Sequence, residues 1–122
     1  MTKTKQQIQD GAGRFDTSTP IGKMYSGMYS KPAYLDALAD WESIAKEAGC
    51  SRADMAYRWV KFNSDLNPEH GDAIIVGASS LDQLKQTLKG MDAGPLRDNI
   101  TSQIDRLWKK IEAEAPLDNY WM

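Results

Sequence analysis

Apolar residues recur every three or four positions over most of the chain after residue 31, which is the spacing of amphipathic helices. This pattern predicts four helices, over about 32–48, 51–64, 80–90 and 96–115. Pro32 suits a first helical turn, Ser51 is a good N-cap, and Gly49 and Pro116 are good terminators. The fold is therefore expected to be mainly α.

A different pattern stands between the second and third predicted helices. Residues 73–76 are four consecutive apolar residues, mostly β-branched, as in a strand buried on both faces. Gly77 permits a turn, and Ser80 and Gln83 have the spacing of a capping box. A strand, a small-residue turn and a helix N-terminus form a natural phosphate site. The pattern predicts one short strand, and its backbone groups need a neighbour.

The first 31 residues are polar and glycine-containing and lack a sustained period, so we expect a mobile or docked N-terminal loop. Tyr25, Met28 and Tyr29 form either one helical turn or a docking surface there. Residues 32–122 are expected to form a single helical domain containing strand 73–76. The aromatic tail, residues 117–122, is expected to pack on the protein.

Composition and charge limit the classes of binding partner and the cellular compartment that we expect for this protein. The net charge of −2 and the pI of about 5.3 provide no basic field for nucleic acid. No apolar run approaches the roughly 18 residues of a membrane span, and the N-terminus lacks the apolar region of a signal peptide. Cys50, the single cysteine, excludes an internal disulfide and fits a reducing compartment. We expect a cytoplasmic protein with no nucleic-acid or membrane partner and, lacking a Cys/His cluster, no metal site.

Several spaced motifs together resemble one enzyme family. Residues 72–86 look like the last barrel strand and cofactor-binding helix of aldo-keto reductases, especially the aflatoxin-aldehyde-reductase subgroup. The likeness extends through Gly13-Arg14-Phe15, through residues 56–59, and from residues 94–96 to Tyr120-Trp121. The resemblance implies a (β/α)8 barrel, of which this chain corresponds to the C-terminal third.

The resemblance also bears on catalysis. The family's catalytic Asp, Tyr, Lys and His lie in the part that precedes this sequence, and no matching motif occurs here. The chain is therefore not expected to be a self-sufficient NADPH-dependent reductase, although a non-redox enzyme stays open. Among its own residues, His70, Asp16, Tyr25 and Tyr29 are candidates for proton transfer, each also explained as a loop or turn residue.

NADP is the cofactor that the resemblance implies. The residues that align with the family's 2′-phosphate and adenine site are Gly77, Ser79, Ser80, Gln83 and Gln86, and Arg14 lies in the cofactor-covering loop. Two departures weaken the site. Thr87 stands where the family usually has Asn, and the Arg or Lys that many members carry near Gly77 and Gln83 is missing. Loss of one charge-assisted bond weakens binding by roughly 1.5–3 kcal/mol.

Three functions remain open. The first is a truncated relative repurposed for a non-redox isomerisation, cyclisation or dehydration of an apolar small molecule, such as a step in a biosynthetic pathway. The aromatic loop and tail would line its pocket. The second is a non-catalytic NADP-type nucleotide-binding or assembly module. The third is the C-terminal piece of a split NADPH-dependent aldehyde or ketone reductase. The apolar strand predicts association, as a homodimer or with a missing barrel chain.

Overall fold

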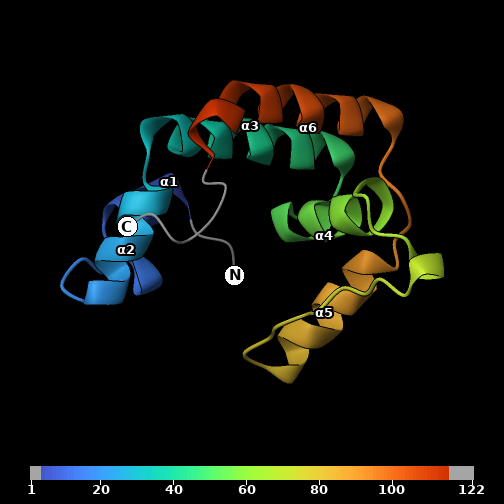
Figure 1. The fold of residues 1–122 in the computed structure, drawn as a ribbon, viewed down its shortest axis with the longest axis horizontal. Helices are drawn as coiled ribbons and strands as arrows, with labels where there is room; N and C mark the ends of the chain where they lie inside the picture. Colours follow the sequence, from blue (N-terminus) through green and yellow to red (C-terminus); the bar gives the residue numbers. More distant parts are fainter. Residues whose placement is uncertain (1–3, 116–122) are drawn as a thin grey trace. The chain divides into compact units, whose positions relative to one another are not determined.

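The computed structural model describes residues 4–115 and is mainly helical (Figure 1). Its elements are α1 (Lys5–Gln9), η1 (Gly13–Phe15), α2 (Pro20–Tyr29), α3 (Pro32–Ala48), α4 (Arg52–Asn63), η2 (Pro68–His70), α5 (Leu81–Met91), α6 (Asp98–Ile111) and η3 (Glu112–Glu114), where η denotes a 3-10 helix. Within the described residues the chain divides into two compact units. The first contains residues 4–43 and 104–115, and the second contains residues 44–103.

The four helices predicted from periodicity are confirmed as α3 to α6. Helix α4 begins after the N-cap Ser51, whose hydroxyl accepts the backbone N–H of Asp54 at 3.0 Å. Helix α5 begins in the same way after Ser80. Helix α6 is shorter than predicted, because its last turn tightens into η3. None of the helices between residues 4 and 115 is long and apolar enough to cross a membrane.

The N-terminal stretch differs from the expected loop, because it contains α1, η1 and α2. Thr4 and Gln7 form a reciprocal capping box that starts α1. Thr19 caps α2 by accepting the N–H of Gly22 at 3.0 Å, and Pro20 occupies the first turn. A Ser/Thr cluster followed by proline is ambiguous in sequence, since it suits both a loop and the start of a helix.

The predicted strand 73–76 is not formed. Residues 72–78 have no regular secondary structure, and the Ile75 side chain is 97% exposed. A strand gains its hydrogen bonds from a neighbour, and no other strand occurs among residues 4–115 to supply them. The single domain expected for residues 32–122 stays a prediction; the described part of it belongs to two compact units whose limits fall within α3 and α6.

The first unit is held together by aromatic and ionic contacts. Helix α2 packs on η1, where the rings of Phe15 and Tyr25 meet edge-to-face with centroids 6.2 Å apart. The start of α3 and the end of α6 bury Leu35 and Leu107. Asp40 on α3 pairs with Lys110 on α6 at 2.8 Å, and both side chains are at least half exposed.

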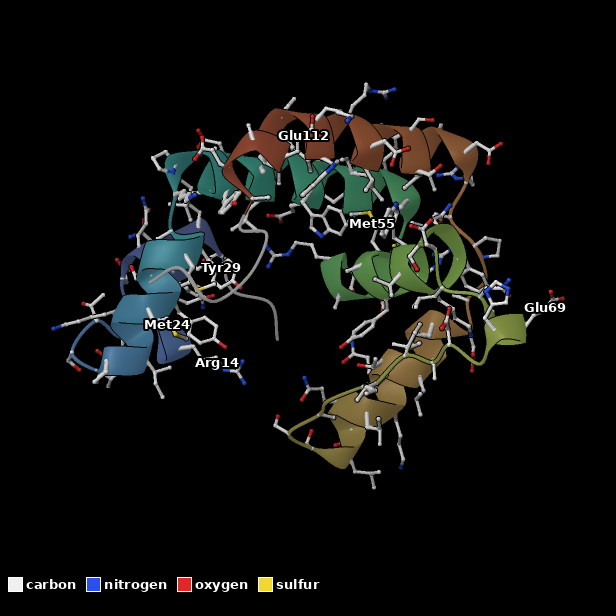
Figure 2. The ribbon with its side chains drawn as sticks, viewed as in Figure 1. Arg14, Met24, Tyr29, Met55, Glu69 and Glu112 are labelled. Atoms are coloured by element: carbon white, nitrogen blue, oxygen red, sulfur yellow. The ribbon has the colours of Figure 1, made fainter. Side chains whose placement is uncertain are left out.

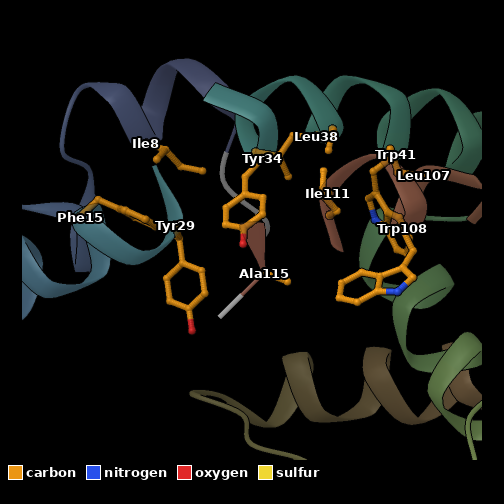
Figure 3. A pocket seen from close by; sticks show the side chains of 11 residues that line it. Ile8, Phe15, Tyr29, Tyr34, Leu38, Trp41, Leu107, Trp108, Ile111 and Ala115 are labelled. Atoms are coloured by element: carbon orange, nitrogen blue, oxygen red, sulfur yellow. The ribbon is translucent and has the colours of Figure 1, made fainter. Parts of the chain in front are cut away.

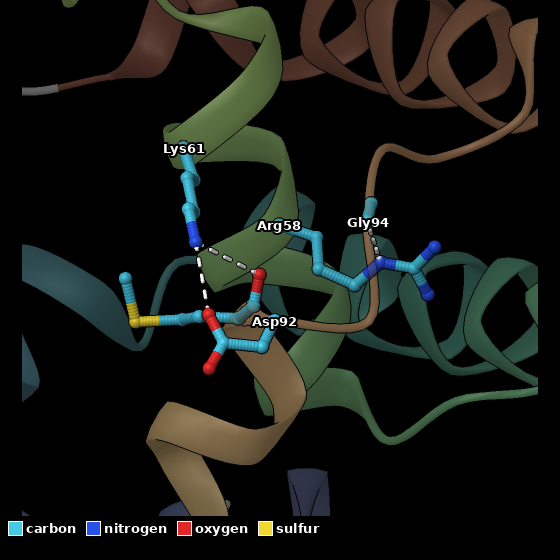
Figure 4. A network of polar contacts seen from close by, with 5 residues as sticks. Arg58, Lys61, Asp92 and Gly94 are labelled. Carbon is cyan, nitrogen blue, oxygen red and sulfur yellow. Dashed lines mark hydrogen bonds and ion pairs between the residues drawn. The ribbon is translucent and has the colours of Figure 1, made fainter. Parts of the chain in front are cut away.

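The second unit is organised around α4. Its Met55 is fully buried and lies on the side of α4 turned toward α3 (Figure 2). On another side, α4 packs on α5, and Arg58 donates to the carbonyl oxygens of Gly94 (Figure 4) and of Pro95, which follow that helix. The backbone beyond α5 is therefore tied to α4 by a charged side chain.

Candidate functional site

The first unit contains an apolar pocket of about 580 Å³ (Figure 3). It lies among side chains from α1, η1, α2, α3, α6 and the residue after η3. The lining consists of Ile8, Phe15, Tyr29, Tyr34, Ala37, Leu38, Trp41, Leu107, Trp108, Ile111 and Ala115. A volume of this size falls in the range of about 300–1,000 Å³ that is typical of small-molecule sites.

Helical geometry brings the pocket side chains together. Tyr34, Leu38 and Trp41 are spaced four and three residues apart, so they share one face of α3. On α6, Leu107 and Ile111 are four residues apart and point the same way. Figure 3 shows the phenols of Tyr29 and Tyr34 toward one end of the pocket and the indoles of Trp41 and Trp108 toward the other. The pocket is therefore bounded by aromatic rings at both ends.

The polar chemistry of the pocket comes from phenol groups. The Tyr34 hydroxyl donates a hydrogen bond to the backbone carbonyl oxygen of Glu114, and Lys31 Nζ donates to the same oxygen at 2.8 Å. Desolvation raises the pKa of Tyr34, and the negative charges of Glu114 and of an ionised Tyr29 raise it further. The phenol is therefore neutral at physiological pH. No lining residue carries a carboxylate or an ammonium group.

Of the four predicted proton-transfer residues, Tyr29 alone is among the residues that line this pocket. Tyr25 instead packs between Phe15 and Tyr29. Asp16 is exposed, and its carboxylate accepts the Ser18 N–H at 2.9 Å. Hydrogen bonds from the side chain and backbone of Ser18 lower the pKa of Asp16, which makes it a weaker base. His70 is exposed in η2 of the second unit.

The structure brings together three of the predicted cofactor residues, Ser79, Ser80 and Gln83, at the start of α5. The Ser79 N–H and hydroxyl both donate to the Gln83 side-chain oxygen at 2.8 Å, and the Ser80 hydroxyl accepts the Gln83 N–H at 3.2 Å. Gly77 and Gln86 are exposed nearby in sequence. The Gln83 side chain thus accepts hydrogen bonds from donors of this turn that a phosphate would otherwise use.

The remaining predicted cofactor residue, Arg14, belongs to the first unit. It is exposed, and its guanidinium lies 5.8 Å from the centre of the Tyr25 ring. Thr87, which departs from the family pattern, is buried in α5. Ser79, Ser80 and Gln83 supply neutral donors, so they fit a phosphate only in part.

Trp41, Trp108 and Tyr34 were not among the predicted site residues. The structure places all three in the pocket lining, and Trp108 is 49% exposed. The available signal was the set of aromatic residues bordering the apolar stripes of α3 and α6. The aromatic tail, residues 117–122, was also expected to line a pocket and lies outside the described residues.

Comparisons with known proteins agree with the motifs in the sequence. The model of the aldo/keto reductase family matches residues 1–109. The chain is 34% identical over 116 residues to oxidoreductase sirO of Leptosphaeria maculans, covering 95% of this chain and 35% of that protein. It is 34% identical over 126 residues to human aldo-keto reductase family 7 member A3, covering 98% and 37%. It is 33% identical over 127 residues to human aflatoxin B1 aldehyde reductase member 4, covering 98% and 38%.

The chain thus spans somewhat more than a third of the length of these curated relatives. The family match covers most of the sequence, and it includes both the turn at Ser79 and the residues of the aromatic pocket up to Trp108. The protein belongs to the aldo/keto reductase family.

Proposed function

We propose that this chain binds an apolar small molecule in the aromatic pocket of its first unit and promotes a non-redox step on it. The observation that supports this proposal is the 580 Å³ cavity with its apolar lining and its few polar atoms. Such a combination is typical of small-molecule sites, where apolar surface provides affinity and a few polar groups provide orientation.

The chemistry suited to this pocket is hydrogen bonding and proton transfer by phenols. Tyr34 has a raised pKa and keeps its proton, which it donates to the Glu114 carbonyl oxygen, so the Tyr29 hydroxyl is the one that can donate to a ligand in the pocket. A neutral phenol can donate a hydrogen bond to an oxygen atom on which negative charge develops. Isomerisation, cyclisation and dehydration all need this kind of assistance, and none of them needs a nicotinamide.

Binding is tested with the neutral fluorescent probe N-phenyl-1-naphthylamine. We expect its emission to rise on mixing with the protein, and we expect Ala37→Phe to reduce the rise because the added ring occupies the pocket. Ala53→Ser, on α4 of the second unit, is the control and should leave the titration unchanged. No increase in emission with the unaltered protein would contradict the proposal. Turnover of a candidate substrate without nicotinamide then tests the catalytic part.

A second function is favoured by the unpaired segment, residues 72–78. Its Ile75 is 97% exposed, which is unusual for an isoleucine, and the segment corresponds to a barrel strand in the family. We propose that this segment pairs with strands of a complementary barrel portion to give an NADPH-dependent reductase. A homodimer in which two copies of the segment pair is the alternative form of association.

Association is tested by light scattering on the purified chain, alone and mixed with the N-terminal two-thirds of a relative such as sirO. A mass equal to one copy of each, together with NADPH-dependent aldehyde reduction, supports the second function. A mass of two copies for the chain alone supports the homodimer. Ile75→Lys should abolish either complex, because it places a charge in the paired strand. A monomer in every sample would contradict this function.

A further inference from the structure

The ring content of the pocket defines the class of compound that it can hold. Five of its eleven lining residues are aromatic, namely Phe15, Tyr29, Tyr34, Trp41 and Trp108. They come from four different elements, η1, α2, α3 and α6. We infer that the pocket selects neutral, planar aromatic compounds over aliphatic compounds of similar size, an inference that rests on the proposed small-molecule function.

Aromatic rings favour aromatic partners beyond the effect of buried area. Their quadrupoles make offset stacking and edge-to-face contacts favourable, and a flat ligand can satisfy several rings at once. Figure 3 shows rings toward both ends of the pocket, with the aliphatic side chains of Leu38 and Ile111 between them. A flat compound lying across Leu38 and Ile111 would therefore meet phenols at one end and indoles at the other.

The same lining residues disfavour a charged ligand. The nearby cation, Lys31, is bound to the Glu114 carbonyl oxygen at 2.8 Å, and Asp40 and Lys110 neutralise each other at 2.8 Å outside this pocket. An ionised ligand would lose hydration without gaining a partner of opposite charge among the lining residues. The ligand is therefore neutral.

One oxygen atom on the ligand is accommodated. The proton of the Tyr34 hydroxyl is engaged with the Glu114 carbonyl oxygen, which leaves the phenol oxygen as an acceptor. The Tyr29 side chain is 38% exposed, and its hydroxyl can donate to a ligand carbonyl or accept from a ligand phenol. An aromatic ketone or phenol thus matches the lining.

The test compares three compounds by tryptophan fluorescence titration of the full chain: 2-acetylnaphthalene, the aliphatic ketone 2-dodecanone, and naphthalene-2-sulfonate. We expect 2-acetylnaphthalene to bind about tenfold more tightly than 2-dodecanone. We expect the sulfonate to show no binding at the same concentrations. Equal affinities for the two ketones, or tight binding of the sulfonate, would overturn the inference and leave the proposed pocket function standing. Absence of binding by all three would overturn both.

Matched substitutions of Trp108 test whether its ring contributes to the preference for aromatic over aliphatic compounds. This residue is 49% exposed, so its replacement leaves the packing of α6 largely intact. We expect Trp108→Leu to lower the affinity for 2-acetylnaphthalene severalfold without lowering that for 2-dodecanone, because leucine keeps apolar surface and loses the ring. Trp108→Phe should retain most of the preference. A ratio of the two affinities that is the same in Trp108→Leu as in the unaltered protein would overturn the inference.

Discussion

The Gln83 side-chain oxygen accepts two hydrogen bonds from Ser79, one from its backbone N–H and one from its hydroxyl, at 2.8 Å each. These are the donors that a phosphate at this turn would use, so a phosphate must displace the glutamine before it can bind. The turn is therefore stable without a ligand. The same arrangement serves as the cap of α5.

Replacing Gln83 with lysine tests whether the turn has kept the ability to bind NADP. The substitution removes the competing acceptor and adds the cation that the resemblance to the family implies near this position. We expect Gln83→Lys to strengthen NADPH binding about tenfold or more, because a charge-assisted bond contributes about 1.5–3 kcal/mol. Titration of NADPH fluorescence measures the affinity.

Gln83→Met provides the control for the lysine substitution, since it removes the same acceptor without adding charge. We expect it to strengthen NADPH binding much less than the lysine does. Equal affinities for the lysine and methionine variants, or no detectable binding by either, would show that this turn is a helix cap and no longer a phosphate site.

Gly22 is required at its position on α2. A Cβ atom placed there would lie 1.8 Å from the carbonyl oxygen of Asp16, and backbone cannot move away as a flexible side chain can. We expect Gly22→Ala to lower the free energy of unfolding of the first unit by about 2 kcal/mol, since the overpacking outweighs the better helix propensity of alanine. Hydrogen exchange of the α2 amides measures the change.

Gly27 is the matched control in the same helix. No atom lies within 4 Å of a Cβ placed there, so Gly27→Ala gains helix propensity without a clash. We expect it to stabilise α2 by about 0.5–1 kcal/mol. A Gly22→Ala protein as stable as the Gly27→Ala protein would show that η1 and α2 do not pack as described.

Arg58 joins α4 to the backbone that follows α5. Its Nε donates to the Gly94 carbonyl oxygen at 2.7 Å (Figure 4), and its Nη2 donates to that of Pro95 at 2.8 Å. We expect Arg58→Leu to destabilise the second unit by about 2 kcal/mol, because leucine keeps part of the packing and leaves both carbonyls without this donor. Urea unfolding followed by circular dichroism measures the loss.

Lys61 offers a comparison one turn further along α4. It pairs with Asp92 at 3.2 Å, and the Asp92 side chain is 78% exposed. Exposed ion pairs contribute little, so Lys61→Met should change stability by less than about 1 kcal/mol. If Lys61→Met were as damaging as Arg58→Leu, the special role assigned to the guanidinium would be refuted.

Local sequence signals predicted the parts of this fold that depend on neighbouring residues. The N-caps Ser51 and Ser80 and the apolar periodicity were sufficient for α4 and α5. The predicted strand failed because a strand depends on a partner, and the described residues contain none. An apolar run such as residues 73–76 indicates that a segment can form a buried strand, but the strand forms only beside neighbouring strands.

The walls of the pocket that α3 and α6 form escaped prediction for a related reason. Tyr34 and Glu114, which are hydrogen-bonded, are separated by 80 positions in the sequence. Trp41 and Trp108 lie on different helices and meet in the lining through folding alone. Periodicity identifies which face of a helix is apolar, but it does not distinguish a packed core from the wall of a cavity. The four proton-transfer candidates therefore came from segments predicted as loops or turns, and Tyr29 is the one that lines the pocket.

The raised pKa of Tyr34 predicts how the first unit responds to alkali. The ordinary tyrosine pKa of 10.0 applies to the unfolded chain, and the folded phenol holds its proton to higher pH. Its contribution to stability is therefore fully present below pH 10.0 and is lost as the pH rises through the folded-state pKa. Ultraviolet absorbance should show a tyrosine that ionises late in the native protein, and Tyr34→Phe should remove that late component. Tyr57→Phe, in the second unit, should leave it in place. A late component that persists in Tyr34→Phe would show that the phenol with the raised pKa is another residue, and that Tyr34 is not held at Glu114 as the structure describes.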